Sequence, residues 1–358
     1  MAKNKMIILF FSRGRGRGHA VPDMAIAAEI TRLRPETIIK FASYGTGAKT
    51  LKASDCDVVD MKMPDANPYL ETLFKAASII QAIKPDVIIA HEEFAALAAA
   101  RLTSCKSIFI AAWLSSSESL ATESMQYADG VVVLEDAGIF PVPLQMQAKP
   151  VFTGPMLREM RYRPADGPRA RAELSIPAEA TVITVLPGSF VLEAHAPIVD
   201  TVVEAIGRFS PVPHLFWVAG KDHAQVKTKT RRLRSKTIIE STTVIEQVMV
   251  ASDLVITKAT RGATLDAAAL GVPTISLSPR INVVDDMLVP RISSNTALTA
   301  GAVDGESLAW HIQEVLNKFP RRRTPRSLIK GCRPAGVAGT ILGEIDRILL
   351  NVQKVPSS

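Results

Sequence analysis

The sequence has few aromatic residues, few cysteines and no long apolar run, and each shortage excludes a class of protein. Aromatic residues make up 5% of the 358 residues and no RNA- or DNA-binding motif is present, so nucleic acid is not an expected partner. The three cysteines, Cys56, Cys105 and Cys332, show no paired or CxxC spacing, which excludes a disulfide framework. No apolar stretch reaches the ~20 residues of a membrane-spanning helix. The remaining composition, 47% hydrophobic and 22% charged, is typical of a globular protein.

Metal-binding patterns are also lacking. The six histidines are scattered without ligand spacing, so the sequence predicts neither a metal site nor a bound cofactor. The formal net charge of +7 favours anionic partners, and we expect phosphorylated substrates or an acidic membrane face. The basic run at residues 318–326 fits membrane contact and a solvated surface equally well.

Residues 1–11 are basic and then apolar, as in a signal peptide. The apolar run is only about six residues, shorter than the ~7–15 of a signal-peptide core, and no small-residue cleavage site follows it. We therefore interpret this run as a first buried strand. The expected localisation is cytoplasmic, with peripheral contact at the inner membrane face as an open alternative.

Short apolar strands alternate with helical segments along the chain, which predicts an α/β fold of two doubly wound, Rossmann-like domains. The predicted strands of the first half are 6–11, 37–42, 58–61, 87–90, 107–111 and 130–134. Those of the second half are 182–186, 214–218, 237–240, 254–256 and 274–277. The predicted helices include 22–34, 68–83, 94–102, 197–208, 244–251, 263–270 and a final one at 333–352.

Turn residues place the domain boundary near Gly154-Pro155 and Arg163-Pro164. The predicted organisation is an N-terminal domain at 1–152, a linker at 153–165, a C-terminal domain at 166–332 and a helical tail at 333–358. Ligands of open parallel sheets bind beyond the carboxyl ends of the strands, so we expect the site in a cleft between the domains.

A glycine-rich loop, SRGRGRGH at residues 12–19, follows the first predicted strand. It is typical either of a structural turn or of a phosphate loop, for which Gly16, Arg17 and Gly18 are the candidates. An NAD-binding interpretation rests on these glycines alone, since no acidic residue at the end of the second strand supports ribose binding. His19 closes the loop, and because histidines ordinarily titrate near about pH 6.5 it is either a structural residue or a general base.

Three polar residues, His91, Glu92 and Glu93, follow the strand predicted at 87–90. Either carboxylate can orient His19 or an acceptor hydroxyl. Acidic side chains are also favoured at helix starts, and we expect at least one of the two to cap the next helix.

The most informative segment is SDLVITKATRGATLDAAALGVP at 252–273, a strand, a polar loop at 257–262 and a helix. Unpaired N–H groups at the start of such a helix bind anions, and Lys258 and Arg261 add positive charge there. Asp266, one turn into the helix, can accept hydrogen bonds from a sugar hydroxyl. Gly188 and Ser189 follow the first strand of the same half, either as an ordinary connection or as a second phosphate contact. Together these features indicate a nucleotide-diphosphate site.

The ordered set of features resembles the GT-B glycosyltransferases, and most of all the group that includes the lipid II N-acetylglucosaminyltransferase and the UDP-glucuronosyltransferases. The resemblance covers nearly the whole chain. Residues 186–189 (LPGS) and 263–271 (ATLDAAALG) also resemble lipid-A-disaccharide synthase. The resemblance implies an acceptor-binding N-terminal domain, a nucleotide-sugar-binding C-terminal domain and a final helix that packs on the N-terminal domain.

The resemblance also implies roles for individual residues. Gly16, Gly18 and His19 match the acceptor-side loop and its candidate base, and Asp266 matches the acidic residue that holds the ribose hydroxyls. The candidate catalytic residues are His19, Glu92 and Glu93. The candidate donor-binding residues are Gly188, Ser189, Lys258, Thr260, Arg261, Gly262, Thr264 and Asp266.

The sequence departs from the family pattern at several positions. Asp266 replaces the usual glutamate, Lys258 stands where many relatives have a diphosphate-binding histidine, and the glycine expected near Thr260 is displaced to Gly262. The pair that grips the donor sugar is not obvious. The nearest substitutes are Asn282, Asp285 and Asp286.

These features predict an inverting, metal-independent transfer of a sugar from a UDP-sugar, with UDP-N-acetylglucosamine among the candidates, to a hydroxyl of a lipid-linked or small-molecule acceptor. No cofactor is expected beyond the UDP-sugar co-substrate. One alternative is a non-catalytic, regulatory protein that binds nucleotide sugars. Another is a UDP-sugar 2-epimerase, which needs a denser set of carboxylates and histidines than the sequence places together.

Overall fold

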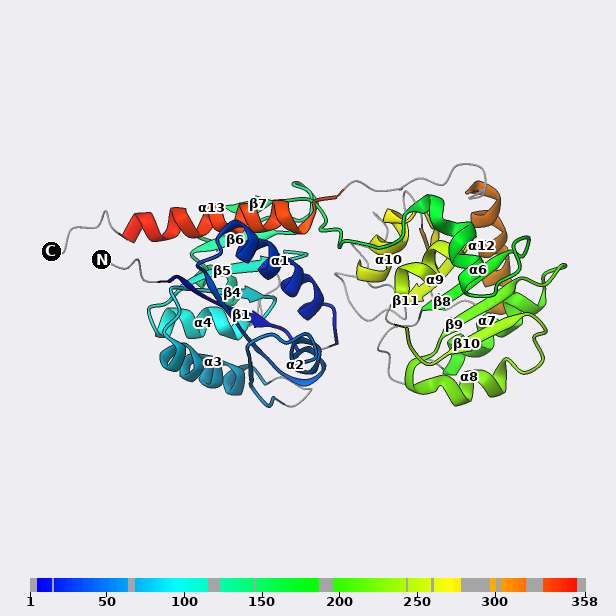
Figure 1. Ribbon diagram of the computed structural model, residues 1–358, viewed down its shortest axis with the longest axis horizontal. Helices are drawn as coiled ribbons and strands as arrows, with labels where there is room; N and C mark the ends of the chain where they lie inside the picture. Colours follow the sequence, from blue (N-terminus) through cyan, green and yellow to red (C-terminus); the bar gives the residue numbers. More distant parts are fainter. Residues whose placement is uncertain are drawn as a thin grey trace. The chain divides into compact units, whose positions relative to one another are not determined.

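The structure, a computed structural model, divides the chain into two compact units (Figure 1). Unit 1 comprises Met1–Glu159 with Gly331–Ser358, and unit 2 comprises Met160–Lys330. Each unit is built around one parallel sheet, which confirms the predicted α/β class. The described residues are 5–14, 16–63, 68–114, 123–144, 146–186, 196–242, 244–258, 261–277, 297–300, 304–319 and 331–352.

Unit 1 contains a seven-stranded sheet in the order β3-β2-β1-β4-β5-β6-β7, and all neighbouring strands are parallel. The strands are β1 (Ile7–Ser12), β2 (Ile38–Ser43), β3 (Val58–Asp60), β4 (Val87–His91), β5 (Lys106–Ala111), β6 (Gly130–Val133) and β7 (Pro150–Phe152). β1 and β4 lie in the middle and are almost fully buried, because their runs of branched and aromatic side chains face helices on both sides.

The helices of unit 1 cover both faces of this sheet. They are α1 (Ala20–Leu33), α2 (Gly45–Lys52), α3 (Tyr69–Ile83), α4 (Phe94–Leu102), the 3₁₀ turn η1 (Ser124–Tyr127) and α13 (Pro334–Val352). α1 and α13 lie side by side on one face, whereas α4, backed by α3, lies on the other (Figure 1). Among the described residues, none of the helices combines the length and the apolar character needed to cross a bilayer.

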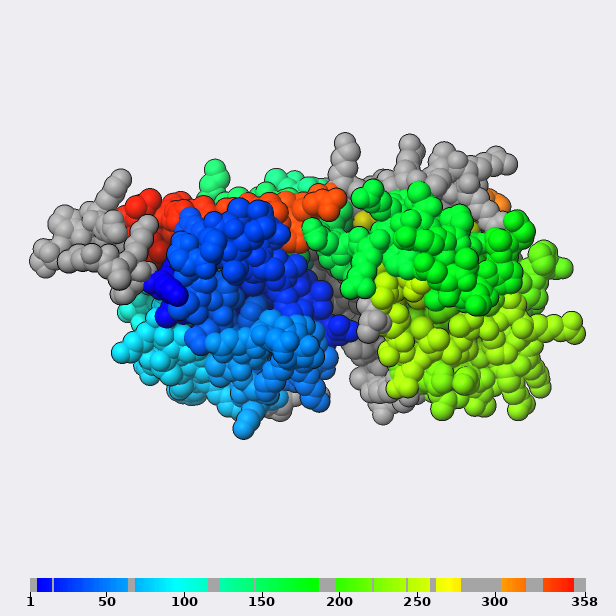
Figure 2. All heavy atoms as spheres, in the orientation of Figure 1, coloured from blue at the N-terminus to red at the C-terminus, as the bar shows by residue number. Residues whose placement is uncertain are grey.

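α13 belongs to unit 1 although it comes from the far end of the chain. Its residues Val337, Ile341 and Ile345 are fully buried in the same core as Ile30 of α1. The guanidinium of Arg34, at the end of α1, forms a two-pronged ion pair with Asp346 of α13. Figure 2 shows α13 running along the surface of this unit beside α1. The last helix therefore completes the first core.

Unit 2 repeats the architecture with a six-stranded parallel sheet in the order β10-β9-β8-β11-β12-β13. Its strands are β8 (Val182–Leu186), β9 (His214–Val218), β10 (Lys236–Ile239), β11 (Leu254–Lys258), β12 (Thr274–Leu277) and β13 (Ala297–Ala300). Its helices are η2 (Pro164–Asp166), α6 (Gly167–Glu173), α7 (Ala196–Gly207), η4 (Gly220–Asp222), α8 (His223–Lys229), α9 (Ile245–Ala251), α10 (Arg261–Ala269) and α12 (Gly305–Lys318). α7 and α12 pack together over one core of this sheet.

Each sheet has one point where the strand order reverses direction, and ligands of open α/β sheets bind at such points. In unit 1 this point lies between β1 and β4, where Ser12 and His91 are paired in register. In unit 2 it lies between β8 and β11, where Leu186 is paired with Thr257 and receives a hydrogen bond from the Thr257 hydroxyl. The candidate residues found in the sequence therefore follow the strands that flank these two points.

The sequence prediction missed short edge elements and misplaced the end of a strand and the start of a helix in the donor segment. β7 and β13 are three and four residues long and lie at sheet edges, where few apolar residues mark a strand. α10 begins at Arg261, so Arg261 and Gly262 belong to its first turn and not to the loop predicted at 257–262. β11 correspondingly extends to Lys258.

Candidate active site

The loop after β1 is shaped by glycines that allow close backbone contact. A Cβ atom on Gly14 would lie 2.2 Å from the carbonyl oxygen of Tyr44, so only glycine fits there. Gly16 has a φ of 73°, in the left-handed region that glycine adopts without strain. These two positions turn the chain sharply from β1 into α1 and place His19 immediately before the first residue of the helix.

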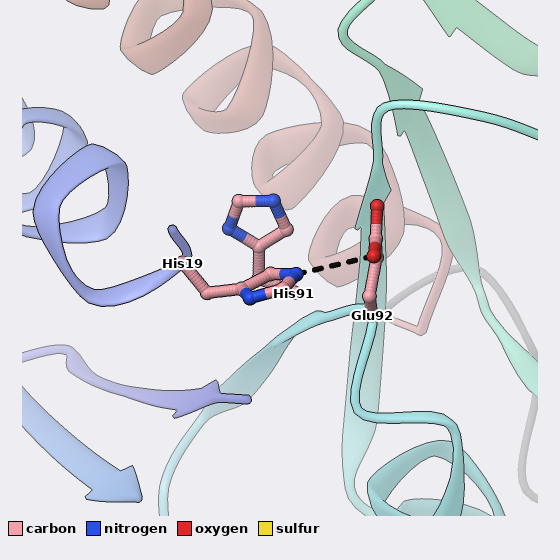
Figure 3. Close-up of side chains that lie close together, drawn as sticks. All are labelled: His19, His91 and Glu92. Carbon is pink, nitrogen blue, oxygen red and sulfur yellow. Dashed lines mark hydrogen bonds and ion pairs between the residues drawn. The ribbon is translucent and has the colours of Figure 1, made fainter. Parts of the chain in front are cut away.

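His19 faces Glu92, which follows β4 (Figure 3). The Nε2 atom of His19 lies 3.1 Å from Oε2 of Glu92, and because a carboxylate only accepts, the ring N–H donates. The other oxygen, Oε1, accepts a hydrogen bond of 3.2 Å from the backbone N–H of Ala112. The His19 side chain is 18% exposed and that of Glu92 is 10% exposed. The pair is thus a histidine and a hydrogen-bonded carboxylate in a largely water-excluded setting.

The Glu92 carboxylate is held in its ionised form. Burial by itself would raise its pKa, but the hydrogen bond from His19, the positive charge of His19 and His91, and the Ala112 N–H outweigh this effect. Together they lower the pKa from 4.5 to about 2. Glu92 also has a φ of 52°, which is strained for a residue with a side chain. The backbone at the end of β4 therefore adopts an unfavourable conformation that aims the carboxylate at His19.

A second buried pair lies behind His19. The Nδ1 atom of His91 donates a 2.6 Å hydrogen bond to Oδ1 of Asp23, whose side chain is fully buried in the first turn of α1. The hydroxyl of Ser12, the last residue of β1, donates to the other oxygen of Asp23. The His91 ring stands edge-on against that of His19, with 4.7 Å between the ring centres. Both histidines are thus oriented by carboxylates on neighbouring elements.

Glu93 has a different partner from the one expected. It occupies the N-cap position of α4, but its side chain makes no capping bond. Its carboxylate accepts a 3.2 Å hydrogen bond from the hydroxyl of Tyr44, whose pKa is raised by burial and by the negative charge of Glu93. Since Glu92 is engaged with His19 and Ala112, neither carboxylate shows the expected capping role. Glu93 thus links the start of α4 to Tyr44, which precedes α2.

The sequence pattern did not reveal the network of Ser12, Asp23 and His91. Asp23 belongs to no recognisable motif, and nothing in the sequence pairs it with Ser12 of the glycine-rich loop or with His91. One signal was available: Ser12 and His91 end two strands that are neighbours at the switch point of a doubly wound sheet. The same convergence brings one ligand atom each of His19, His91 and Glu92 within 4.8 Å of one another, an arrangement that can hold a metal ion.

Two further candidate residues of the glycine-rich loop lie at the surface. Arg17 and Gly18 are exposed, and the carbonyl of Arg17 accepts a hydrogen bond from Val21 N in the first turn of α1. A Cβ atom on Gly18 would meet no neighbouring atom, so packing does not require a glycine there. The exposed stretch is available to a ligand, and its expected role in acceptor or phosphate binding stays a prediction.

Several of the expected donor-binding residues lie outside the described residues, namely Gly188, Ser189 and Thr260 together with the substitutes Asn282, Asp285 and Asp286. Lys258 is the last residue of β11 and Arg261 the first of α10. Both backbone positions flank the switch point of unit 2, as an anion site at a helix start requires.

Three donor candidates on α10 can be placed more fully. Gly262 is exposed in the first turn, and Asp266, one turn later, is half-buried. Residues four apart lie on the same side of a helix, so Gly262 and Asp266 share a face. Thr264 is fully buried, so a bound nucleotide reaches its side chain only if a neighbouring group moves.

A known protein family matches part of the chain. The family model of lipid-A-disaccharide synthetase matches residues 145–296, less than half of the chain and mostly in unit 2. The matched stretch contains β8, β11 and α10, the elements around the predicted donor site. No curated protein matches the chain by sequence at a significant level.

Three solved structures resemble the chain along nearly its whole length. MurG of Acinetobacter baumannii is 15% identical with a TM-score of 0.67, and the match covers 96% of this chain and 99% of that one. The calicheamicin glycosyltransferase CalG4 is 16% identical with a TM-score of 0.68, covering 96% and 99%. A UDP-N-acetylglucosamine 2-epimerase described as putative, from Listeria monocytogenes, is 14% identical with a TM-score of 0.68, covering 95% of each.

The chain has the GT-B fold. Its resemblance is to the GT-B nucleotide-sugar glycosyltransferases, as the sequence motifs predicted. The family match and the structural neighbours together support a glycosyltransferase.

Proposed function

We propose that this protein is an inverting, metal-independent glycosyltransferase that moves a sugar from a UDP-sugar to an acceptor hydroxyl. One observation carries the proposal: His19, at the start of α1, donates its Nε2–H to the ionised Glu92 at the carboxyl end of β4. This is the arrangement of a general base and its orienting carboxylate. It lies at the switch point of unit 1, where open α/β sheets bind their ligands.

The hydrogen bond to Glu92 determines which atom of His19 acts. With the proton on Nε2, the lone pair is on Nδ1, and this atom has no hydrogen-bond partner among the described residues. We propose that Nδ1 removes the proton of the acceptor hydroxyl. The acceptor oxygen then bonds to the anomeric carbon as the bond from that carbon to the diphosphate breaks and UDP leaves. Because Nδ1 is buried, the ring must turn or the adjoining loop must open when the acceptor binds.

The departing diphosphate needs electrostatic stabilisation, which we assign to unit 2. Lys258 and the start of α10 supply a positive side chain and the free N–H groups of a helix start at the same sheet edge. Gly188 and Ser189 would contribute the second turn. The structural neighbours include a putative UDP-N-acetylglucosamine 2-epimerase and a glycosyltransferase, so UDP-N-acetylglucosamine is the first donor to test.

Asp266 is proposed to hold the ribose hydroxyls of the donor. The Asp266→Ala variant should bind UDP about 10- to 100-fold more weakly, because a hydrogen bond to a charged group contributes roughly 1.5–3 kcal/mol. Titration calorimetry with UDP measures this change. The Asp266→Glu variant carries the residue usual in the family and should keep the affinity within a few-fold.

A matched control for this experiment is Asp200→Ala on α7. Asp200 is an exposed aspartate of the same unit. Among the described residues, its side chain is hydrogen-bonded to Lys229 alone. Its removal should leave UDP affinity unchanged. Equal affinities for Asp266→Ala and Asp200→Ala would exclude Asp266 from the donor site.

Incubation with UDP-N-acetylglucosamine and a panel of hydroxyl acceptors tests the proposed reaction against its alternatives. A transferase releases UDP in proportion to the glycoside formed. A 2-epimerase instead produces the epimeric UDP-sugar without release of UDP, an outcome to check because of the Listeria neighbour. Binding of UDP with no turnover of any UDP-sugar would favour the non-catalytic alternative.

A lipid-linked acceptor agrees with an apolar surface on unit 1. Leu70 and Phe74, one turn apart on α3, are 64% and 67% exposed. We propose that they contact an anionic membrane, to which the net charge of +7 also draws the protein. Replacing both with serine should weaken binding to anionic lipid vesicles by about 10-fold or more, since each buried side chain contributes roughly 1.5–3 kcal/mol.

Co-sedimentation with vesicles measures this binding. The control is Leu144→Ser, because Leu144 is 99% exposed in the same unit but lies between β6 and β7. Equal binding of the double variant, the control and the wild type would show that α3 does not contact the membrane.

A further inference from the structure

Three groups that bind transition metals converge at the end of the unit 1 sheet. One nitrogen of His19, one nitrogen of His91 and one oxygen of Glu92 all lie within 4.8 Å of one another. His19 Nε2 and Glu92 Oε2 are 3.1 Å apart. Ligands of tetrahedral zinc, bound at about 2.1 Å, lie roughly 3.4 Å from one another. A metal ion can therefore replace the proton between His19 and Glu92 with little movement of either side chain.

The orientation of His91 is the second observation. Its Nδ1–H is donated to the buried carboxylate of Asp23, which in turn receives the hydroxyl proton of Ser12. A histidine held in this way has its lone pair on Nε2. Metal-binding histidines almost always donate their other ring N–H to a carboxylate, a carbonyl or water, which fixes the tautomer and increases the basicity of the ligand. Asp23 occupies this supporting position.

The chemistry of the three groups indicates the class of metal. His91 and Glu92 are buried and His19 is partly buried. A carboxylate and two imidazoles form the ligand set that suits zinc and its neighbours in the first transition series. Magnesium, by contrast, prefers oxygen ligands and retains its water.

We propose that His19, His91 and Glu92 form a binding site for a divalent transition metal of the zinc class, with Asp23 as the residue that orients His91. Three protein ligands leave a fourth position of a tetrahedral ion open to water or to a hydroxyl. The site lies wholly within unit 1 and uses only described residues.

Occupation of this site regulates transfer, an inference that rests on the proposed function. A metal bound to Nε2 of His19 leaves the remaining ring proton on Nδ1. Nδ1 then has no lone pair with which to remove the acceptor proton. The metal therefore inhibits the enzyme, and metal-free protein is the active form.

The test begins with the metal alone and needs no substrate. Tag-free full-length protein, stripped with a chelator, is titrated with Zn²⁺ by calorimetry and should bind one equivalent through this site. His91→Gln should weaken this binding by roughly 100-fold or more, and Asp23→Asn by about 10- to 100-fold. His311→Ala, which removes a histidine from α12 of unit 2, is the matched control and should bind as the wild type does.

Cobalt provides a measurement that separates this site from the thiols. Co²⁺ bound by nitrogen and oxygen ligands shows its d–d bands without a thiolate charge-transfer band, and the spectrum should be lost in Glu92→Gln. Melting curves establish whether each variant is folded. If a variant does not fold, the wild-type Co²⁺ spectrum by itself still distinguishes nitrogen and oxygen ligands from thiolate ligands. Zinc affinity equal in the wild type, His91→Gln and Glu92→Gln, or a thiolate band in the wild type, would overturn the proposal.

The activity measurement separates the two proposals. Transfer by the wild type should fall more than 10-fold at saturating Zn²⁺ and recover when EDTA is added. The His91→Gln variant should transfer sugar at the same rate with Zn²⁺ as with EDTA. Zinc binding without any transfer supports the metal site and overturns the transferase proposal. Transfer that is unaffected or stimulated by bound zinc overturns the inhibition and leaves the transferase proposal in place.

Discussion

The His19→Ala variant is expected to transfer sugar ~10²- to 10⁴-fold more slowly than the wild type, the usual contribution of a general base. The loss should appear in kcat, because the acceptor hydroxyl must be deprotonated as it attacks. Affinity for UDP should be unchanged, since the donor-binding candidates belong to unit 2 and His19 to unit 1. UDP release measures the rate, and calorimetry measures donor binding.

Two conditions make the His19 experiment decisive. Assays contain EDTA, so that any metal at the site does not obscure the role of the base. His223→Ala serves as the control, because His223 lies on α8 of unit 2 and its ring nitrogen Nε2 faces the backbone carbonyl of Ile238. A His19→Ala variant that is folded and as fast as His223→Ala would rule out His19 as the base.

Replacing Glu92 with glutamine should lower kcat by roughly 10²- to 10³-fold with little change in KM. The amide has nearly the same shape but carries no charge, so it neither enforces the Nε2–H form of His19 nor stabilises the imidazolium formed during transfer. Glu36→Gln, an exposed carboxylate of the same unit, is the control and should keep full activity. Equal rates for the two variants would show that Glu92 does not position the base.

The pH dependence distinguishes an electrostatic role of Glu92 from a merely structural one. The pKa of Glu92 is lowered to about 2, so the carboxylate is ionised throughout the range of an enzyme assay. Loss of a negative charge beside an imidazole disfavours the protonated ring, and the acid limb of the pH–rate profile should therefore move to lower pH in Glu92→Gln. The same depressed pKa stabilises the folded state above about pH 4.5, a contribution that disappears as the pH falls toward 2.

The strands of the central sheets could be predicted from sequence because burial on both faces leaves a continuous apolar run. β8, β9 and β12 have the predicted bounds, β4 is one residue longer than predicted, and β1 is displaced by one residue at both ends. Short edge strands lack that signal, because one side has no neighbouring strand and the run is brief. Tertiary packing, and not local pattern, defines β7 and β13.

The candidate site was predictable only in part, and the reason is geometric. His19 could be identified because it closes the glycine-rich loop after an apolar strand, and Glu92 because it lies just beyond another apolar strand. Asp23 could not be identified, because acidic residues are common in the first turn of a helix. Its role becomes visible only when the structure places His91 within hydrogen-bonding distance. The partners of Glu92 and Glu93 also required the structure, because the sequence favours helix capping for such residues.

The packing of α13 on α1 has a consequence for how the protein is made. The core around Ile30 is closed by Val337, Ile341 and Ile345, which leave the ribosome after all of unit 2 has been synthesised. Unit 1 therefore emerges first but keeps an open apolar face until the residues that follow unit 2 have been synthesised. Such a delay exposes unit 1 to aggregation and to chaperones. Docking of the last helix is thus the final step in the folding of the first domain.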